Sequence, residues 1–228
     1  MNNWKTILTN FISLSGGELL SKGIAFVTTI YLARVISPEG FGILGYSTAF
    51  VSYFLLFIDF GFDTISVKRI ANDRNNISKY ANNIISFRIL IASLIFIILT
   101  IVTLYLNEST IVKLAILVTG LNLFVQSFMT EFVFQATEKI KYLSIKVVAK
   151  NIIILALVFT LVRSISDILL VVGISVLANL IMNIWLFNKY TKIFSKYYWS
   201  IDRAFLKTLF LESYPLIISS FMIPIYYN

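Results

Sequence analysis

The chain has 228 residues, of which 58% are hydrophobic and 13% charged, and its formal net charge is +8. Soluble domains contain about 45–50% apolar and about 25% charged residues, so this composition excludes an ordinary soluble domain. The chain has no Cys and no His, which excludes disulfide bonds, Cys/His zinc sites and His-based proton relays among its residues. The composition indicates a membrane protein.

Apolar stretches of about 20 residues, the length that a helix needs to cross a bilayer, recur along the chain. Lipid requires every backbone polar group to be paired within the protein, and the stretches lack the alternation of outer-membrane strands, so we expect helices. The predicted spans, in chain order, are 8–33, 41–60, 84–106, 111–135, 146–163, 167–187 and 207–226. The predicted fold class is an all-α, polytopic transmembrane helix bundle.

The basic residues are distributed unevenly between the two sides of this bundle. If the N-terminus is inside, most of the 19 Lys and Arg residues flank the inside ends of the spans, and the outside segments carry only Arg34, Lys113 and Arg163. This asymmetry predicts a cytoplasmic N-terminus. The basic inner loops also account for the net charge without a nucleic acid, with anionic membrane lipids as expected partners.

The first span carries two opposite charges, Glu18 and Lys22, within the sequence SGGELLSKG. With a rise of about 1.5 Å per residue, both lie near the middle of the bilayer, where charges are costly and usually functional. Their i,i+4 spacing allows them to pair. They are either a structural ion pair inside the bundle or part of a polar cavity for an ionic ligand or a coupling ion, and we favour the cavity.

The same span contains a row of small residues: Ser13, Gly17, Ser21 and Ala25. Such a row allows another helix to approach closely. Glu18 and Lys22 project about 100° around the helix from this row. We therefore expect the two charges near a packed seam.

The second span ends in FIDFGFDTISVKR, which places Asp59 and Asp63 four residues apart. Carboxylates near the C-terminus of a helix are unfavourable unless a cation compensates them. We expect Lys68 and Arg69 to supply this compensation. Structural pairing and a role in an inner gate both stay open.

Polar side chains recur at helical spacing in the fourth and sixth spans. The rows are Asn122, Gln126 and Thr130, then Ser127, Glu131 and Gln135, and finally Ser175, Asn179 and Asn183. A polar face at membrane depth needs helix partners or water. We expect the amides of the sixth span to hold helices together and Glu131 to be the stronger functional candidate.

Enzyme signatures are missing from the sequence. It contains no Gly-rich phosphate loop, no dinucleotide-binding fingerprint and no metal-ligand cluster, so we expect no cofactor and no metal. Nothing indicates ATP hydrolysis. Transport driven by an ion gradient or by the substrate's own gradient is favoured over an ATP-driven pump.

Residues 17–71 contain YLAR, then SPEGFGILGY, then DFGFDTISVKRIA. This region resembles the first two helices of bacterial lipid-linked oligosaccharide flippases of the O-antigen type, the polysaccharide-transport branch of the multidrug/oligosaccharidyl-lipid/polysaccharide exporter superfamily. The positions that match the family pattern are Leu32, Ala33, Arg34, Phe41, Gly42, Asp59, Gly61 and Arg69. Beyond residue 71 the resemblance rests on span spacing and on ESYPLIISS.

The resemblance implies two pseudosymmetric lobes around a central cavity. Residues 1–206 would form one six-helix lobe, and residues 207–228 an incomplete seventh helix that starts the second lobe. Alternating access needs both lobes. We therefore expect the chain to be a fragment, a truncated product, or a half that pairs with a second lobe or a second copy.

The implied substrate is an undecaprenyl-diphosphate-linked sugar repeat unit, passed across the bacterial cytoplasmic membrane for surface polysaccharides such as the O-antigen of lipopolysaccharide. The candidate substrate contacts are Lys22, Arg34, Arg69 and Arg88, which the resemblance implies, together with Glu18, Gln126 and Glu131 from the polar positions of the first and fourth spans. Lys22 would bind the diphosphate, Arg34 would lie at the outer mouth of the cavity, and Arg69 and Arg88 would contact the headgroup of the substrate at the inner mouth. Polysaccharide assembly proteins are expected partners.

Two other functions stay open. The first is an ion-coupled multidrug antiporter of the same architecture, in which Glu18, Asp59, Asp63 and Glu131 would carry protons or sodium. The second is a membrane-embedded glycosyltransferase or polymerase that acts on the same lipid carrier. Such enzymes usually need a sizeable soluble domain, and no connecting segment is long enough to form one.

Overall fold

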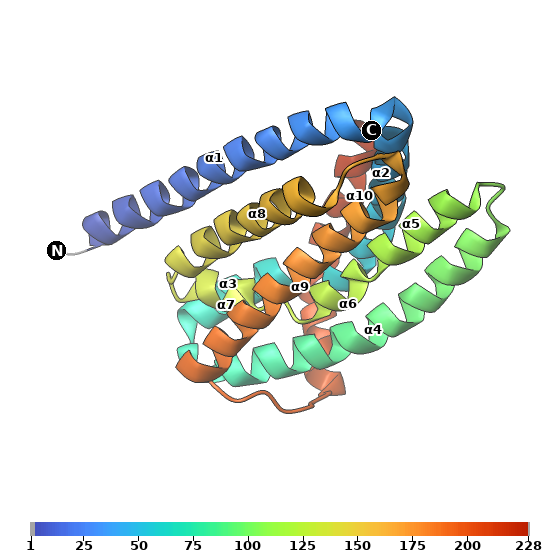
Figure 1. The fold of residues 1–228 in the computed structure, drawn as a ribbon. Coiled ribbons are helices and arrows are strands. Elements are labelled where there is room, and N and C mark those ends of the chain that lie inside the picture. The colour runs from blue at the N-terminus through green and yellow to red at the C-terminus, as the bar shows by residue number, and fades with distance from the viewer. Residues whose placement is uncertain (1–2, 228) are drawn as a thin grey trace.

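The computed structural model describes residues 3–227, with side chains described for residues 14–215. Within these residues all regular structure is helical (Figure 1). The α-helices are α1 (Asn3–Val35), α2 (Ser37–Asp59), α3 (Phe62–Asn72), α4 (Ile77–Tyr105), α5 (Thr110–Gly120), α6 (Asn122–Ser127), α7 (Glu131–Ala136), α8 (Lys141–Leu161), α9 (Ile168–Ile193) and α10 (Arg203–Tyr227). The predicted all-α fold class is confirmed.

Five helical stretches of the described residues are long and apolar enough to cross a membrane, so the protein is a multi-pass membrane protein. They are Ser37–Asn72, Arg74–Tyr105, Thr110–Ala136, Lys141–Leu161 and Ile165–Ile193. Five of the seven predicted spans coincide with these stretches. The other two, 8–33 and 207–226, lie within α1 and α10. The division into lobes at residue 206 stays a prediction.

Two of the five stretches are interrupted. The stretch Ser37–Asn72, which contains the predicted second span, turns at Phe60 and Gly61 and continues as α3. The φ angles of these two residues, 50° and 72°, are left-handed. The stretch Thr110–Ala136 contains the predicted fourth span, which was expected to be one helix over 111–135. It consists instead of α5, α6 and α7, with a non-helical connection between Ser127 and Glu131. Broken helices inside a membrane are tolerated where other protein groups or a water-filled cavity satisfy the freed backbone.

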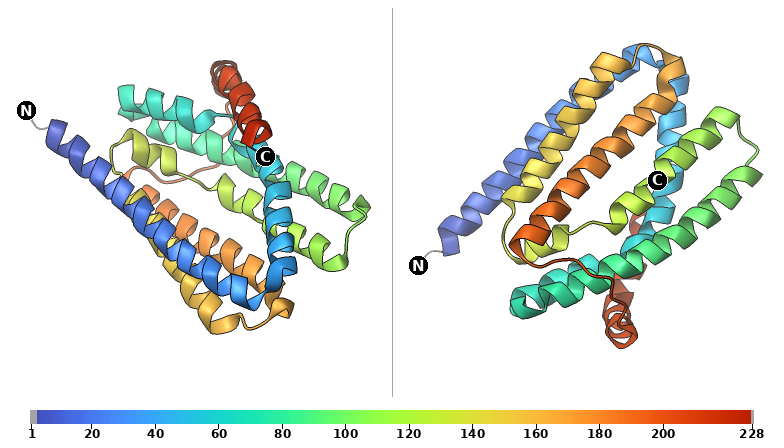
Figure 2. Two further views of the ribbon diagram at one scale, coloured as in Figure 1. Left: turned by 90° about the horizontal axis from the view of Figure 1, so that it is seen from above. Right: turned by 60° about the horizontal axis from the view of Figure 1, so that its bottom comes forward.

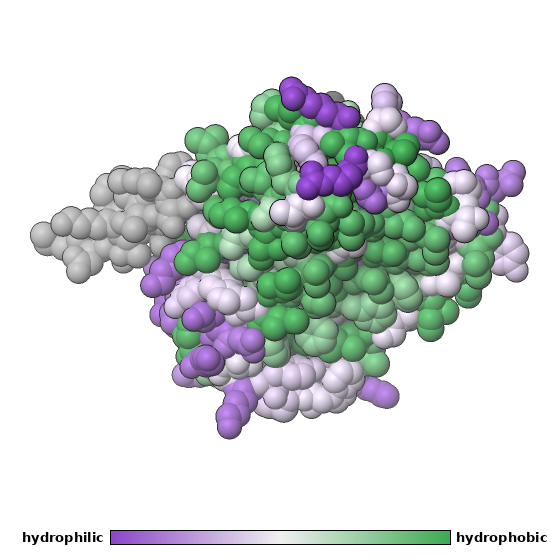
Figure 3. Space-filling model, in the orientation of Figure 1, coloured by the Kyte–Doolittle hydropathy of each residue, from purple (hydrophilic) through white to green (hydrophobic). Residues whose placement is uncertain are grey.

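The helices α1, α8, α9, the α5–α6 pair and α4 lie side by side in this order, and α2 crosses one face of this row (Figure 2). Apolar side chains cover the middle of the face seen in Figure 3. Many large apolar residues of the described helices, such as Phe26, Leu94 and Ile184, are exposed. This surface suits the hydrocarbon core of a bilayer.

The row of small residues on α1 packs closely against another helix, as predicted, and this helix is α8. A Cβ atom built on Gly17 would lie 2.9 Å from the Cβ of Ser144, so only glycine fits there without a shift. One turn further on, Ser21 is buried, and the Asn151 amide donates to its carbonyl at 3.1 Å and to its hydroxyl. The side chain of Ser13 lies outside the described residues.

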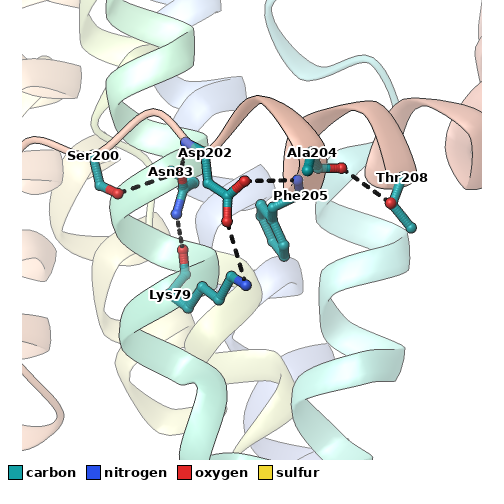
Figure 4. A network of polar contacts seen from close by, with 7 residues as sticks. All are labelled: Lys79, Asn83, Ser200, Asp202, Ala204, Phe205 and Thr208. Carbon is teal, nitrogen blue, oxygen red and sulfur yellow. Dashed lines mark hydrogen bonds and ion pairs between the residues drawn. The ribbon is translucent and has the colours of Figure 1, made fainter.

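The segment before α10 is anchored to α4 by polar contacts (Figure 4). Asn83 Oδ1 accepts from the Asp202 backbone N–H at 2.6 Å, and Lys79 Nζ lies 3.5 Å from the Asp202 carboxylate. The same carboxylate caps α10, because it accepts the Phe205 N–H at 3.0 Å. This N–H and the Lys79 ammonium lower the pKa of Asp202, so the cap is complete above the usual pKa of aspartate and weakens as the pH falls through the lowered value.

Candidate functional site

A polar cavity of about 360 Å³ lies between α2, α5, α6, α8 and α9 and reaches the start of α7. Its polar lining consists of Thr48, Ser52, Thr119, Asn122, Gln126, Glu131, Lys146, Lys150, Asn179 and Asn183. Leu55, Val125, Met129 and Val147 complete the wall. A polar pocket within membrane-spanning helices is the kind of feature that marks a substrate or ion pathway.

The Lys146 ammonium lies in the wall of this cavity and pairs with the Glu131 carboxylate. It also donates to Asn183 Oδ1 at 2.8 Å. The Lys146 side chain is only 8% exposed, whereas the Glu131 side chain is 27% exposed. Removing one partner of a buried ion pair typically costs about 3–5 kcal/mol, since the other charge stays behind uncompensated.

A chain of amides extends from this ion pair along α9. Asn183 donates to the Asn179 carbonyl at 3.0 Å, and Asn179 donates to Asn122 Oδ1 at 3.1 Å. Asn122 in turn donates to the Thr119 carbonyl at 3.0 Å, next to the junction of α5 and α6. The amides of α9 therefore hold helices together, as expected, and they line the cavity as well.

Lys150 is a second cation of the cavity, one helical turn beyond Lys146 on α8. No ion pair or hydrogen bond joins its ammonium to any side chain described in residues 14–215. With Glu131 and Lys146 compensating each other, Lys150 gives the cavity an excess positive charge. This arrangement can accept an anionic group.

A second charged cluster lies at the break between α2 and α3. Arg88 of α4 is 1% exposed, and its guanidinium pairs with the Asp59 carboxylate and, at 2.9 Å, with Asp63. Its Nε donates to the Ile58 carbonyl at 3.3 Å. The expectation that Lys68 and Arg69 compensate the two aspartates is therefore wrong, because the Arg88 guanidinium of α4 pairs with both of them.

The predicted substrate contacts are found in different places. Gln126 and Glu131 line the cavity. Glu18 and Lys22 are exposed on α1, form no ion pair with each other, and lie outside the cavity lining. Of the two interpretations left open for these charges, the structural ion pair is therefore not observed, and the favoured role in a cavity for an ionic ligand stays a prediction. Arg34 is exposed at the end of α1.

The two arginines expected at the inner mouth have other partners. Arg69 Nε donates to Glu212 Oε2 at 2.9 Å, which connects α3 to α10 at the surface. Arg88 is enclosed by the aspartates of its cluster, so the structure does not place it at an exposed rim. Structural pairing and an inner-gate role were both open for Asp59 and Asp63. Their contacts with the buried Arg88 favour structural pairing.

Sequence reasoning missed Lys146 and Lys150 as site residues, because it counted them among the basic residues of an inner loop. The helix that carries them begins at Lys141, earlier than the predicted span 146–163. Their i,i+4 spacing on an otherwise apolar helix is the signal that indicates a shared face.

Comparison with known proteins identifies the family of this chain. Residues 7–228 match the family model described as "Polysaccharide biosynthesis protein". The chain belongs to this family. It is also 28% identical over 169 residues to a protein of Escherichia coli (strain K12) named "Putative O-antigen transporter".

The alignment with this relative covers 71% of the chain and 40% of the relative, so the chain spans less than half of the relative's length. No solved structure matches the chain. The resemblance to polysaccharide transporters, deduced from residues 17–71, is confirmed by the family match.

Proposed function

We propose that this chain is the first lobe of a transporter that flips undecaprenyl-diphosphate-linked oligosaccharide repeat units across the bacterial cytoplasmic membrane for surface polysaccharide biosynthesis. Membership of the polysaccharide biosynthesis family and the similarity to the O-antigen relative support this function. The single observation that carries it is the polar cavity with its unpaired ammonium at Lys150.

The cavity has the chemistry that such a substrate needs. An ammonium group is a common phosphate ligand, and Lys150 has no competing carboxylate of its own. Amide groups of Asn122, Gln126 and Asn179 offer donors and acceptors to sugar hydroxyls. Ligand pockets commonly have volumes of about 300–1,000 Å³, and this cavity of about 360 Å³ lies at the small end of that range.

The excess positive charge favours this substrate over the cationic drugs of an antiporter. A cationic drug would meet Lys150 without a matching carboxylate, and Asp59 and Asp63 are already engaged by Arg88. A glycosyltransferase is disfavoured by the short segments between the helices of the described chain. Transport without an enzymatic step is therefore the better proposal.

Orientation and partners follow from the same proposal. The N-terminus lies in the cytoplasm, with the basic segments on the inner side in contact with anionic lipids. A second lobe, or a second copy of the chain, completes the pathway together with polysaccharide assembly proteins. The roles of Glu18, Lys22 and Arg34 as substrate contacts stay predictions, since these residues are exposed in this lobe.

Replacement of Lys150 by Gln tests the proposal. In cells that depend on this protein, Lys150→Gln in the full-length protein should lower surface polysaccharide at least about tenfold and cause the lipid-linked repeat unit to accumulate, because a phosphate contact of about 1.4 kcal/mol or more is lost. Lys192→Gln, which removes an exposed lysine of α9, is the matched control. Equal polysaccharide levels in both variants would reject the role of the cavity.

A further inference from the structure

The connection between α9 and α10 lies along α4 and contains no helix over residues 194–202. Its backbone pairs with side chains of α4. The Tyr198 N–H donates to Asn82 Oδ1 at 3.4 Å, and the Ser200 N–H donates to the Ser86 hydroxyl at 3.1 Å, beside the contacts shown in Figure 4. Asn82 and Ser86 are completely buried. This pairing satisfies backbone donors that would otherwise need water.

These contacts lie well inside the end of α4. The helix begins at Ile77, so Asn82 and Ser86 are five and nine residues further along it. At a rise of about 1.5 Å per residue, the two contacts are about 8 and 14 Å from the start of the helix. The third predicted span begins at residue 84, between them. The connection therefore lies where the hydrocarbon core is expected to meet the headgroup region, which is about 5–8 Å thick on each side.

Three large side chains of this connection are exposed. Tyr198, Trp199 and Ile201 are 56%, 53% and 38% exposed. Tyr197, by contrast, is directed inward, since its hydroxyl forms a hydrogen bond with the Ser86 hydroxyl at 3.0 Å. Trp and Tyr are enriched at membrane–water interfaces, which accommodate both an apolar ring and a polar tip. A lipid interface would bury the apolar surface that water leaves exposed.

Basic residues flank these exposed side chains. Lys196 and Arg203 are exposed, and neither forms an ion pair with a carboxylate of the described residues. Basic residues near a membrane surface are attracted to anionic headgroups. Apolar and aromatic side chains next to free cations are typical of segments that lie in a membrane surface.

We propose that residues 196–203 form an interfacial anchor in the leaflet on their side of the membrane. The three exposed apolar side chains insert between the headgroups and the acyl chains, and the two flanking cations contact anionic headgroups. Because Asp202 belongs to this segment and caps α10, the anchor also holds the start of that helix at the membrane surface. The leaflet is the inner one in the proposed orientation, and the inference holds whichever substrate is transported.

Fluorescence of Trp199 in the full-length protein in nanodiscs tests the anchor. Trp199 is kept, and every other Trp, including Trp4 and Trp185, is replaced by Phe. Lipids brominated near the headgroup end of their acyl chains quench a Trp that lies among them, whereas acrylamide quenches a Trp in water. The matched control combines Trp199→Phe with Asn75→Trp, since Asn75 is exposed in the turn that precedes α4.

We expect brominated lipid to quench Trp199 at least about twofold more strongly than the control Trp, and acrylamide to quench it less. In mixed nanodiscs of phosphatidylglycerol and phosphatidylcholine, with bromine on one lipid at a time, brominated phosphatidylglycerol should quench Trp199 more strongly than brominated phosphatidylcholine. Lys196→Gln combined with Arg203→Gln should remove this preference. Lys141→Gln, which neutralises an exposed lysine at the start of α8, should keep it.

A cysteine variant covers the case in which replacement of Trp185 disturbs folding. The chain has no Cys, so Trp199→Cys in a full-length protein free of other cysteines carries an environment-sensitive dye at this one position. We expect its emission to be shifted to the blue relative to that of Asn75→Cys carrying the same dye.

The results that would overturn the anchor differ from one another. Quenching of Trp199 by acrylamide as strong as that of the control Trp would place the connection in water. Protection of Trp199 from both quenchers would show that another part of the protein covers it. Equal quenching by the two brominated lipids would overturn the role of Lys196 and Arg203. None of these results bears on the transported substrate, which is tested separately.

Discussion

The two charged clusters of this lobe are built alike, but only one of them lines the polar cavity. In each, a cation from a long helix pairs with carboxylates at a break between shorter helices: Arg88 with Asp59 and Asp63, and Lys146 with Glu131. In the arginine cluster the cation is fully buried, with Arg88 1% exposed, and none of the three residues lines the cavity, although the Asp59 side chain is 36% exposed. The lysine cluster faces a cavity and has a spare cation next to it. From this difference we propose that the first cluster stabilises the fold and that the second binds the substrate.

The largest expected effect on stability comes from opening the arginine cluster. Arg88→Leu leaves Asp59 and Asp63 without their cation and should lower the free energy of unfolding by about 3–5 kcal/mol. Unfolding of the purified protein in detergent measures this change. Adding Asp59→Asn and Asp63→Asn should restore most of the loss, because no buried charge then lacks a partner. A triple variant as unstable as Arg88→Leu would contradict the structural role.

A smaller loss is expected in the amide chain that links the cavity helices. Asn179→Ala removes the 3.1 Å hydrogen bond to Asn122 and should cost about 0.5–1.5 kcal/mol. A double-mutant cycle with Asn122→Ala isolates the contact. Strict additivity of the two changes would show that the amides contribute independently, against the geometry described above.

The smallest effect is expected at the exposed pair between α3 and α10. Arg69→Gln breaks the contact with Glu212 and should change stability by about 0–1 kcal/mol, because water and salt screen exposed pairs. The same unfolding measurement at low and high salt checks it. A loss as large as that of Arg88→Leu would remove the distinction between buried and exposed arginines on which the comparison rests.

The sequence was sufficient for those features that depend on local pattern. Span positions follow from hydrophobic length, and the close packing of another helix on α1 follows from the small residues Gly17 and Ser21, although the sequence does not say that this helix is α8. The family follows from a local motif. Gln126 and Glu131 were found because polar side chains at helical spacing stand out in an apolar span.

The remaining features depend on tertiary contacts. The partner of Asp59 and Asp63 comes from α4, and nothing near the aspartates in sequence indicates Arg88. Lys146 and Lys150 lie in the N-terminal half of α8, close enough to the preceding connection for the sequence to read them as basic residues of an inner loop. The break after Ser127 has neither Gly nor Pro, so the sequence offers no breaker to predict it.

Flipping of a fluorescent lipid-linked repeat unit by the full-length protein in proteoliposomes tests the central claim most directly, with the wild type compared with Lys150→Gln and Lys192→Gln. Our account predicts that Lys150→Gln flips at least about tenfold more slowly while Lys192→Gln keeps the wild-type rate. A wild-type rate in Lys150→Gln would contradict the assignment of this cavity to the diphosphate.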